Sequence, residues 1–169
     1  MIPSFPSDAT IPSIHLACFR TGQHSSLKSS IRDTYGQQGH IHNQLGFRAS
    51  SFNDRVLHGA MDVAELMDRH SMFSLISSIV NPTTAVRLRE ALALGDVKTY
   101  MRCRALHDHG IKKITVLRQC PSCVREDVDM FGTGHWRVMH QVPAGGSLPA
   151  CSMKVPGLGG QSAQHGRQV

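Results

Sequence analysis

The sequence predicts a mainly α-helical protein in three parts. A helical N-terminal domain is expected over residues 1–108, a small β unit over 109–143, and an irregular, disordered tail over 144–169. Apolar residues recur at helical spacing in the first part and are interrupted by glycines and capping residues. A closely spaced cysteine pair lies between two β-type runs in the second. The third is rich in Gly and Pro and has no apolar period.

The first expected helices are short and end at glycines. Three prolines in residues 1–12 predict an extended entry. A helix from Pro12 to Arg20 then ends at Gly22, and Ser25-Ser26 cap a second helix that stops at Gly36. Two short helices joined by a glycine-containing turn are compatible with a helix-turn-helix. Ordinary helical packing explains them equally well.

The strongest helical pattern lies between Val63 and Val80, where spacings of three and four give one apolar face. We expect this helix to form the centre of the core. His70 lies on that face, so we expect a buried, hydrogen-bonded histidine rather than a ligand. The H-x-H of His40 and His42, in a polar stretch upstream, could bind a metal, but solvated loop histidines are the commoner case.

Two further helices follow a clear break. Asn81 is suited to cap a helix that has Pro82 in its first turn and closes at Gly95. Asp96 caps a last helix that runs to about Leu106. We expect the inward face of this last helix to consist of Val97, Tyr100, Met101 and Ala105. Cys18 and Cys103 are interpreted as small core residues.

Composition limits the class of protein. The chain has 169 residues, a formal charge of +6 and a pI near 9.4, which favours a polyanionic partner. No apolar run approaches the ~20 residues needed to span a bilayer, and the N-terminus does not resemble a signal peptide. Five cysteines with one close pair favour metal binding in a reducing compartment over a disulfide framework. We therefore expect a cytoplasmic protein without membrane contact.

Cys120 and Cys123 form a C-x-x-C motif, the spacing of half a structural zinc site with Zn–S bonds of about 2.3 Å. Pro121 stiffens the turn between them. The β-type runs 114–118 and 135–140 flank the motif, and together they predict a zinc-ribbon-like unit that binds Zn²⁺. The same motif also fits a redox dithiol that opens a helix, or a pair without metal. A thioredoxin-like domain would need more chain after its motif than remains here.

Several blocks of this sequence resemble the TniQ/TnsD family of transposon target-selection proteins. The stretch CPSCVREDVDMFGTGHWRVMHQVP carries C-P-x-C, an acidic patch, a glycine turn, a Trp-Arg strand and H-Q-x-P. Upstream blocks are similar in order and spacing: Phe5-Pro6, Ser13 to Ala17, Tyr35-Gly36, Leu45-Gly46, and Leu66 to Leu75. The resemblance implies a transposition accessory protein that binds target DNA or a targeting complex and recruits the transposon's ATPase regulator.

The sequence departs from that family after about residue 143, as a truncated or altered copy would. The family pattern supplies a second ligand pair as C-P-x-H, but here Cys151 is followed three residues later by Lys154, whose protonated amine cannot coordinate a metal. Cys151 is therefore our third candidate ligand, ahead of His140 or His135. In a strand these two histidines would point to opposite faces, so at most one would reach the metal.

Basic residues crowd the segment before and through the C-x-x-C motif, against a single acid, Asp108. This crowding predicts a phosphate-binding surface, and a merely solvated basic face is the alternative. The candidate nucleic-acid-binding residues are Lys98, Arg102, Arg104, Lys112, Lys113, Arg118 and Arg125.

No catalytic constellation is present, since the sequence has no phosphate loop with a Lys, no G-x-S-x-G and no H-E-x-x-H. We therefore expect a protein that is not an enzyme. Three functions stay open: the TniQ-like DNA-binding protein, a zinc-ribbon module that contacts only protein, and a thiol oxidoreductase that uses Cys120 and Cys123.

Overall fold

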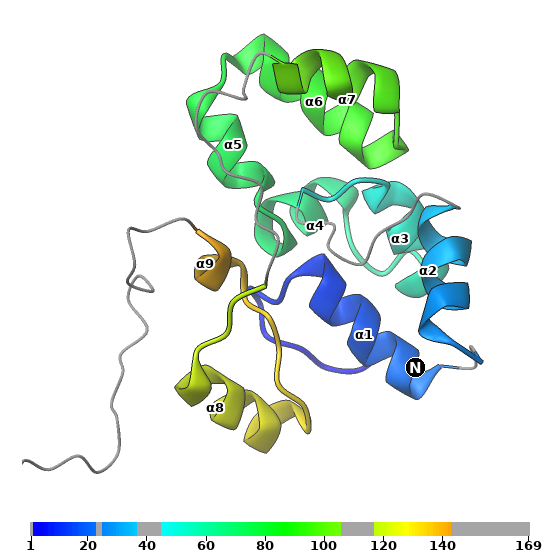
Figure 1. The fold of residues 1–169 in the computed structure, drawn as a ribbon, viewed down its shortest axis with the longest axis vertical. Coiled ribbons are helices and arrows are strands. Elements are labelled where there is room, and N and C mark those ends of the chain that lie inside the picture. The colour runs from blue at the N-terminus through cyan, green and yellow to red at the C-terminus, as the bar shows by residue number, and fades with distance from the viewer. Residues whose placement is uncertain (1, 23–24, 37–44, 106–116, 143–169) are drawn as a thin grey trace, which may run out of the picture.

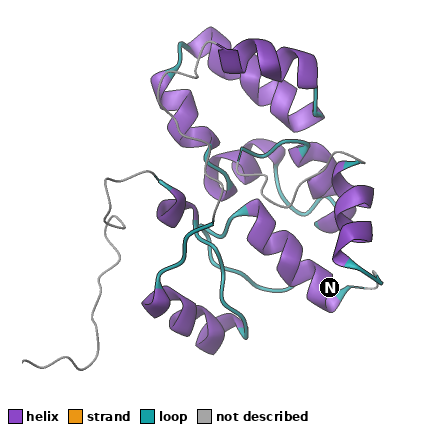
Figure 2. Cartoon of the chain, viewed as in Figure 1, coloured by secondary structure: helices purple, strands orange, loops and turns teal. Residues whose placement is uncertain are grey.

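A computed structural model describes residues 2–22, 25–36, 45–105 and 117–142 of the chain, without the side chains of Arg104 and Ala105. These residues form helices and loops and contain no β-strand (Figure 2). The prediction of a mainly helical protein is confirmed. The helices are α1 (Ile11–Thr21), α2 (Leu27–Tyr35), α3 (Ala49–Val56), α4 (Val63–His70), α5 (Phe73–Ile79), α6 (Pro82–Leu94), α7 (Val97–Ala105), α8 (Pro121–Phe131) and α9 (Val138–Gln141).

Helix ends lie where the capping residues predicted them. The Ser26 hydroxyl accepts a hydrogen bond from the Ser29 backbone N–H at 3.2 Å and begins α2, which ends at Gly36. Asn81 begins α6 in the same way, with its Oδ1 2.8 Å from the N of Thr84. Gly95 ends α6 at a positive φ of 77°, a conformation that residues with a Cβ rarely adopt. These ends were predictable because each cap is a local interaction.

The helix expected from Val63 to Val80 is wrong, because the chain breaks into α4 and α5. Ser71 is the cause. Its hydroxyl donates to the carbonyl of Met67 at 2.6 Å and accepts from the backbone N–H of Phe73 at 3.0 Å. The side chain thus replaces two helical backbone bonds, so the apolar face continues across a bend.

The core lies between α1 and α6, with α4 in the middle of the molecule (Figure 1). As expected, His70 is buried and hydrogen-bonded, with its Nδ1 2.6 Å from the carbonyl oxygen of Ala9. The expected inward face of α7 is wrong in part, since Val97 and Met101 are 49% and 53% exposed. Large fully buried core residues include Ile11, Ile14, Phe52, Leu57, Leu66, Met67, Phe73, Leu88 and Leu92.

The zinc-ribbon-like β unit is not present in the described part of residues 109–143. Cys120 is the N-cap of α8, and Pro121 occupies the first helical position, where its missing N–H costs nothing. The run expected as a strand over 135–140 instead turns into α9 at Val138. Residues 114–116 and the tail expected over 144–169 lie outside the described residues.

The segment between α8 and α9 pairs with the N-terminal segment of the chain. Ala9 and Arg137 form an antiparallel bridge, an isolated one within the described residues. The N–H of Thr10 donates to the carbonyl of Trp136 at 2.7 Å, and the N–H of Val138 donates to the carbonyl of Asp8 at 2.8 Å. These bonds hold the segment between α8 and α9 beside the start of α1 (Figure 1).

Candidate metal centre

Cys120 and Cys123 lie together on the first turn of α8. Cys120 is the N-cap, and its carbonyl accepts the N–H of Val124 at 2.9 Å. Both side chains are buried, with 0% and 9% of their surface exposed. The two-residue spacing therefore places both thiols on one side of a helix start, where the positive end of the helix dipole stabilises thiolates.

His140 on α9 completes a cluster with the two cysteines. One ligand atom from each residue lies within 4.8 Å of the others, and all three residues are buried. A tetrahedral Zn²⁺ with 2.3 Å bonds would bring the two sulfurs to roughly 3.8 Å, so the side chains need only a small adjustment. Two thiolates and one imidazole are a donor set that suits zinc. Burial, and next to it the charge of Arg137, lowers the pKa of His140, which favours the neutral imidazole that binds metal.

Gln141 fixes the distance between α9 and the segment that enters α8. Its side chain is fully buried. The amide Oε1 accepts the N–H of Arg118 at 3.0 Å, and Nε2 donates to the carbonyls of Arg118 at 2.9 Å and Arg137 at 3.0 Å. Because Arg118 is two residues before Cys120 and Gln141 directly follows His140, this amide aligns the ligands from both sides.

A buried ion pair joins α8 to the segment that precedes α9. The carboxylate of Asp127 is 0% exposed and lies 2.6 Å from Arg137 Nη2, while its other oxygen accepts the backbone N–H of His135 at 3.2 Å. Arg137 also lies 3.7 Å from the carboxylate of Asp8. The ion pair therefore ties α8, the segment before α9 and the N-terminal segment together.

The other candidate ligands do not join the cluster in the described part of the chain. His135 is buried, but its Nδ1 is 3.0 Å from the hydroxyl of Ser13. Of the two histidines, His140 lies in the cluster of the described residues and His135 does not. His140 lies on α9 and His135 lies in the loop before it, so the two do not point to opposite faces of a strand as expected. Cys151, His40 and His42 lie outside the described residues. His140, ranked behind Cys151 from the sequence, is the third candidate ligand that the structure brings to the two cysteines.

The described members of the basic set are exposed but are not gathered on one face. Lys98 and Arg102 lie on α7, whereas Arg125 lies on α8, and these helices are at opposite ends of the molecule in Figure 1. Arg118 is exposed just before α8, and Arg125 Nη2 donates to the Ser122 hydroxyl at 3.3 Å. The side chain of Arg104 is not described, and Lys112 and Lys113 lie outside the described residues.

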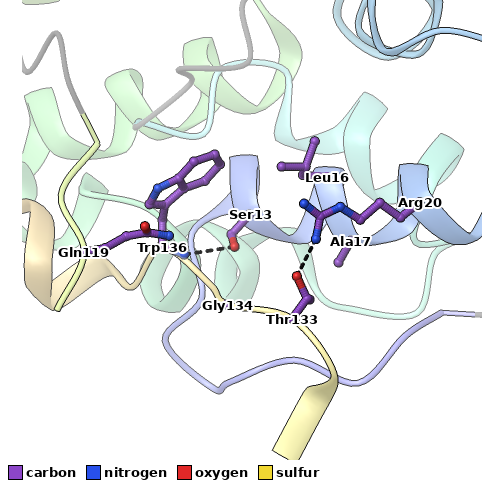
Figure 3. A pocket seen from close by; sticks show the side chains of 8 residues that line it. All are labelled: Ser13, Leu16, Ala17, Arg20, Gln119, Thr133, Gly134 and Trp136. Atoms are coloured by element: carbon purple, nitrogen blue, oxygen red, sulfur yellow. Dashed lines mark hydrogen bonds between the residues drawn. The ribbon is translucent and has the colours of Figure 1, made fainter. Parts of the chain in front are cut away.

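A small cleft of about 90 Å³ separates α1 from the segment that precedes α9. Figure 3 shows Trp136 on one side of it and Arg20 on the other. Ser13 lies between them, and its hydroxyl accepts the backbone N–H of Trp136 at 3.0 Å. The Arg20 guanidinium donates to the hydroxyl of Thr133. Sequence reasoning did not identify Ser13, Asp127 or Gln141 as positioning residues, although all three stand in the motif blocks quoted above.

Comparison with known proteins adds no relative. No family model matches the chain, and neither the curated proteins nor the solved structures contain a match. None of the helices in the described ranges is long and apolar enough to cross a membrane.

Proposed function

We propose that this chain is a zinc-stabilised DNA-binding accessory protein of transposition, of the TniQ/TnsD kind, and not an enzyme. The observation that supports this best is the buried cluster of Cys120, Cys123 and His140. Zinc at these residues would link the start of α8 to α9 and so stabilise the fold. Cys151, the remaining candidate ligand from the sequence, lies outside the described residues.

Charge supports DNA as the partner. Phosphate contacts need exposed cations, and the exposed Lys98 and Arg102 on α7 and Arg118 and Arg125 near α8 supply them at two places. A long duplex is a partner that can touch two separated basic sites at once. Recruitment of a transposition ATPase regulator rests on the ordered motif blocks of the sequence.

A protein-interaction module without DNA binding is the second candidate. It is favoured by large apolar side chains that are exposed near the end of α5 and on α6 and α7. These are Ile79, Val86, Leu94, Val97 and Met101. A thiol oxidoreductase fits less well, because a nucleophilic thiolate must be accessible and Cys120 is fully buried.

Zinc content measured by mass spectrometry of the purified protein tests the metal. Cys120→Ser should lose the bound zinc, because a cluster with one thiolate fewer cannot hold it. Cys18→Ser is the matched control, since this cysteine is half-buried on α1 and outside the cluster, and it should keep wild-type zinc. Equal zinc in the wild type and in Cys120→Ser would contradict the assignment.

The salt dependence of DNA affinity tests the partner. Log affinity should fall with log salt by about 0.9 for each phosphate contact. The double variant Lys98→Gln/Arg102→Gln and the double variant Arg118→Gln/Arg125→Gln should each reduce that slope by up to about 2. If neither pair changes the slope, the protein-interaction candidate is the better one.

A further inference from the structure

The cleft beside α1 combines an aromatic ring, one cation and amide and hydroxyl groups, and contains no acid. This composition distinguishes it from a gap in packing, because each group faces a common space (Figure 3). At about 90 Å³ it is smaller than a whole nucleotide, so a bound nucleotide would enter it only in part, and it excludes a base pair. The cleft is lined by Ser13, Leu16, Ala17, Arg20, Gln119, Thr133, Gly134 and Trp136.

Trp136 is held in place through its backbone on both sides. Its N–H donates to the Ser13 hydroxyl at 3.0 Å, and its carbonyl accepts the N–H of Thr10 at 2.7 Å. The indole itself is only half-buried and stands at one end of the cleft (Figure 3). These bonds fix the backbone from which the indole projects, and the ring keeps an exposed face on which a second flat ring can stack.

Arg20 supplies a positive charge at the other end. It lies in the last turn of α1, is exposed, and donates to the Thr133 hydroxyl. Among the described residues, no carboxylate forms an ion pair with its guanidinium. A hydroxyl neutralises no charge, so the guanidinium remains able to bind an anion in the cleft.

We propose that this cleft receives one unpaired nucleotide, with its base on the indole of Trp136 and its phosphate on Arg20. The exposed amide of Gln119 borders the same space and can hydrogen-bond a base edge. Aromatic rings that stack bases beside cations that hold phosphates are the usual means of binding single strands. The inference rests on the proposed DNA binding and narrows it to unpaired DNA, as at a distorted or melted target site. An acidic peptide would use Arg20 but gain little from the indole face.

Tryptophan fluorescence gives a direct test, since Trp136 is the single tryptophan of the chain. An unpaired thymidine octamer should quench the Trp136 fluorescence of the zinc-loaded protein, and a blunt duplex of equal length should leave it unchanged. Anisotropy of labelled octamer then gives affinities for the variants. Trp136→Phe should bind nearly as well as wild type, whereas Trp136→Leu, which keeps apolar bulk without a π face, should bind about 5- to 150-fold more weakly.

Arg20→Gln tests the phosphate end while it keeps an amide donor for Thr133. It should lower the slope of log affinity for the octamer against log salt by about 0.7, the value of one single-strand phosphate. Arg32→Gln is the matched control, because Arg32 is also exposed in the last turn of a short helix but does not line the cleft. That control should leave the slope unchanged.

Duplex binding, followed in parallel by anisotropy, separates the possible failures. If the duplex binds and the octamer neither quenches Trp136 nor depends on it, the cleft inference is overturned and the proposed function stands. If octamer affinity is insensitive to both Trp136→Leu and Arg20→Gln, single strands bind elsewhere and the inference is again overturned. Equal quenching by octaglutamate would show a general anion site and overturn the inference. Absence of any DNA binding would overturn both proposals.

Discussion

Replacing Gln141 with Leu should weaken both the fold and the metal centre. The change removes three hydrogen bonds of 2.9–3.0 Å and leaves both backbone groups of Arg118 without their partner. Each bond contributes about 1 kcal/mol, so the loss of three should lower the free energy of unfolding by about 2–4 kcal/mol. Since zinc binding requires Cys120 beside His140, a loss of 2 kcal/mol there would lower zinc affinity about thirtyfold.

Chelator competition measures the zinc affinity, and denaturant unfolding followed by helical circular dichroism measures stability. Gln141→Glu is a useful second variant, because its carboxylate still accepts the Arg118 N–H but cannot donate to either carbonyl. Met139→Ala is the control, as that side chain is 37% exposed and lies next to the ligand His140. Zinc affinity within twofold of wild type in Gln141→Leu would refute the role assigned to this amide.

Three further predictions concern stability. Asp127→Asn should lower the free energy of unfolding by about 3 kcal/mol, because Arg137 loses its buried counter-ion; an unfolding curve that matches wild type would contradict this. Gly95→Ala should destabilise the protein more than Gly59→Ala. Both glycines have a positive φ, but of the two only Gly95 would bring a Cβ into collision with a side chain. Equal losses in the free energy of unfolding would be evidence against the packing described. Burial lowers the pKa of three histidines, so the folded state favours their neutral forms. The free energy of unfolding of the metal-free protein should therefore be at its full value above pH ~6.5 and fall as the pH drops through that value. A flat profile in denaturant melts from pH 5 to 7.5 would exclude the effect. The three are His70, His135 and His140.

Local signals predicted the helix ends, and tertiary contacts decided what the sequence could not show. Ser26, Asn81 and Gly95 act on backbone groups within a few residues, so their positions are readable from the chain alone. Ser71 breaks a helix that has an unbroken apolar period, and its hydroxyl is as compatible with a helix interior as with a bend. The exposure of Val97 and Met101 shows that apolar spacing predicts a face but not what covers it.

The candidate metal cluster was predicted in part. The C-x-x-C spacing identified Cys120 and Cys123, but the same motif suits a ribbon turn and a helix start, and Pro121 favours the helix because it lacks an N–H. His140 joins the cysteines because of the pairing of residues 8–10 with 136–138, far apart in the chain. No local pattern encodes a contact of that kind, which is why His140 was ranked behind Cys151 from the sequence.

The zinc K-edge X-ray absorption spectrum of the purified protein tests the central claim most directly. A site built on Cys120, Cys123 and His140 predicts bound zinc with at least two sulfurs at about 2.3 Å and an imidazole nitrogen at about 2.0 Å. The imidazole signal should disappear in His140→Ala. A wild-type shell that contains only oxygen and nitrogen, or purified protein without zinc, would contradict the account.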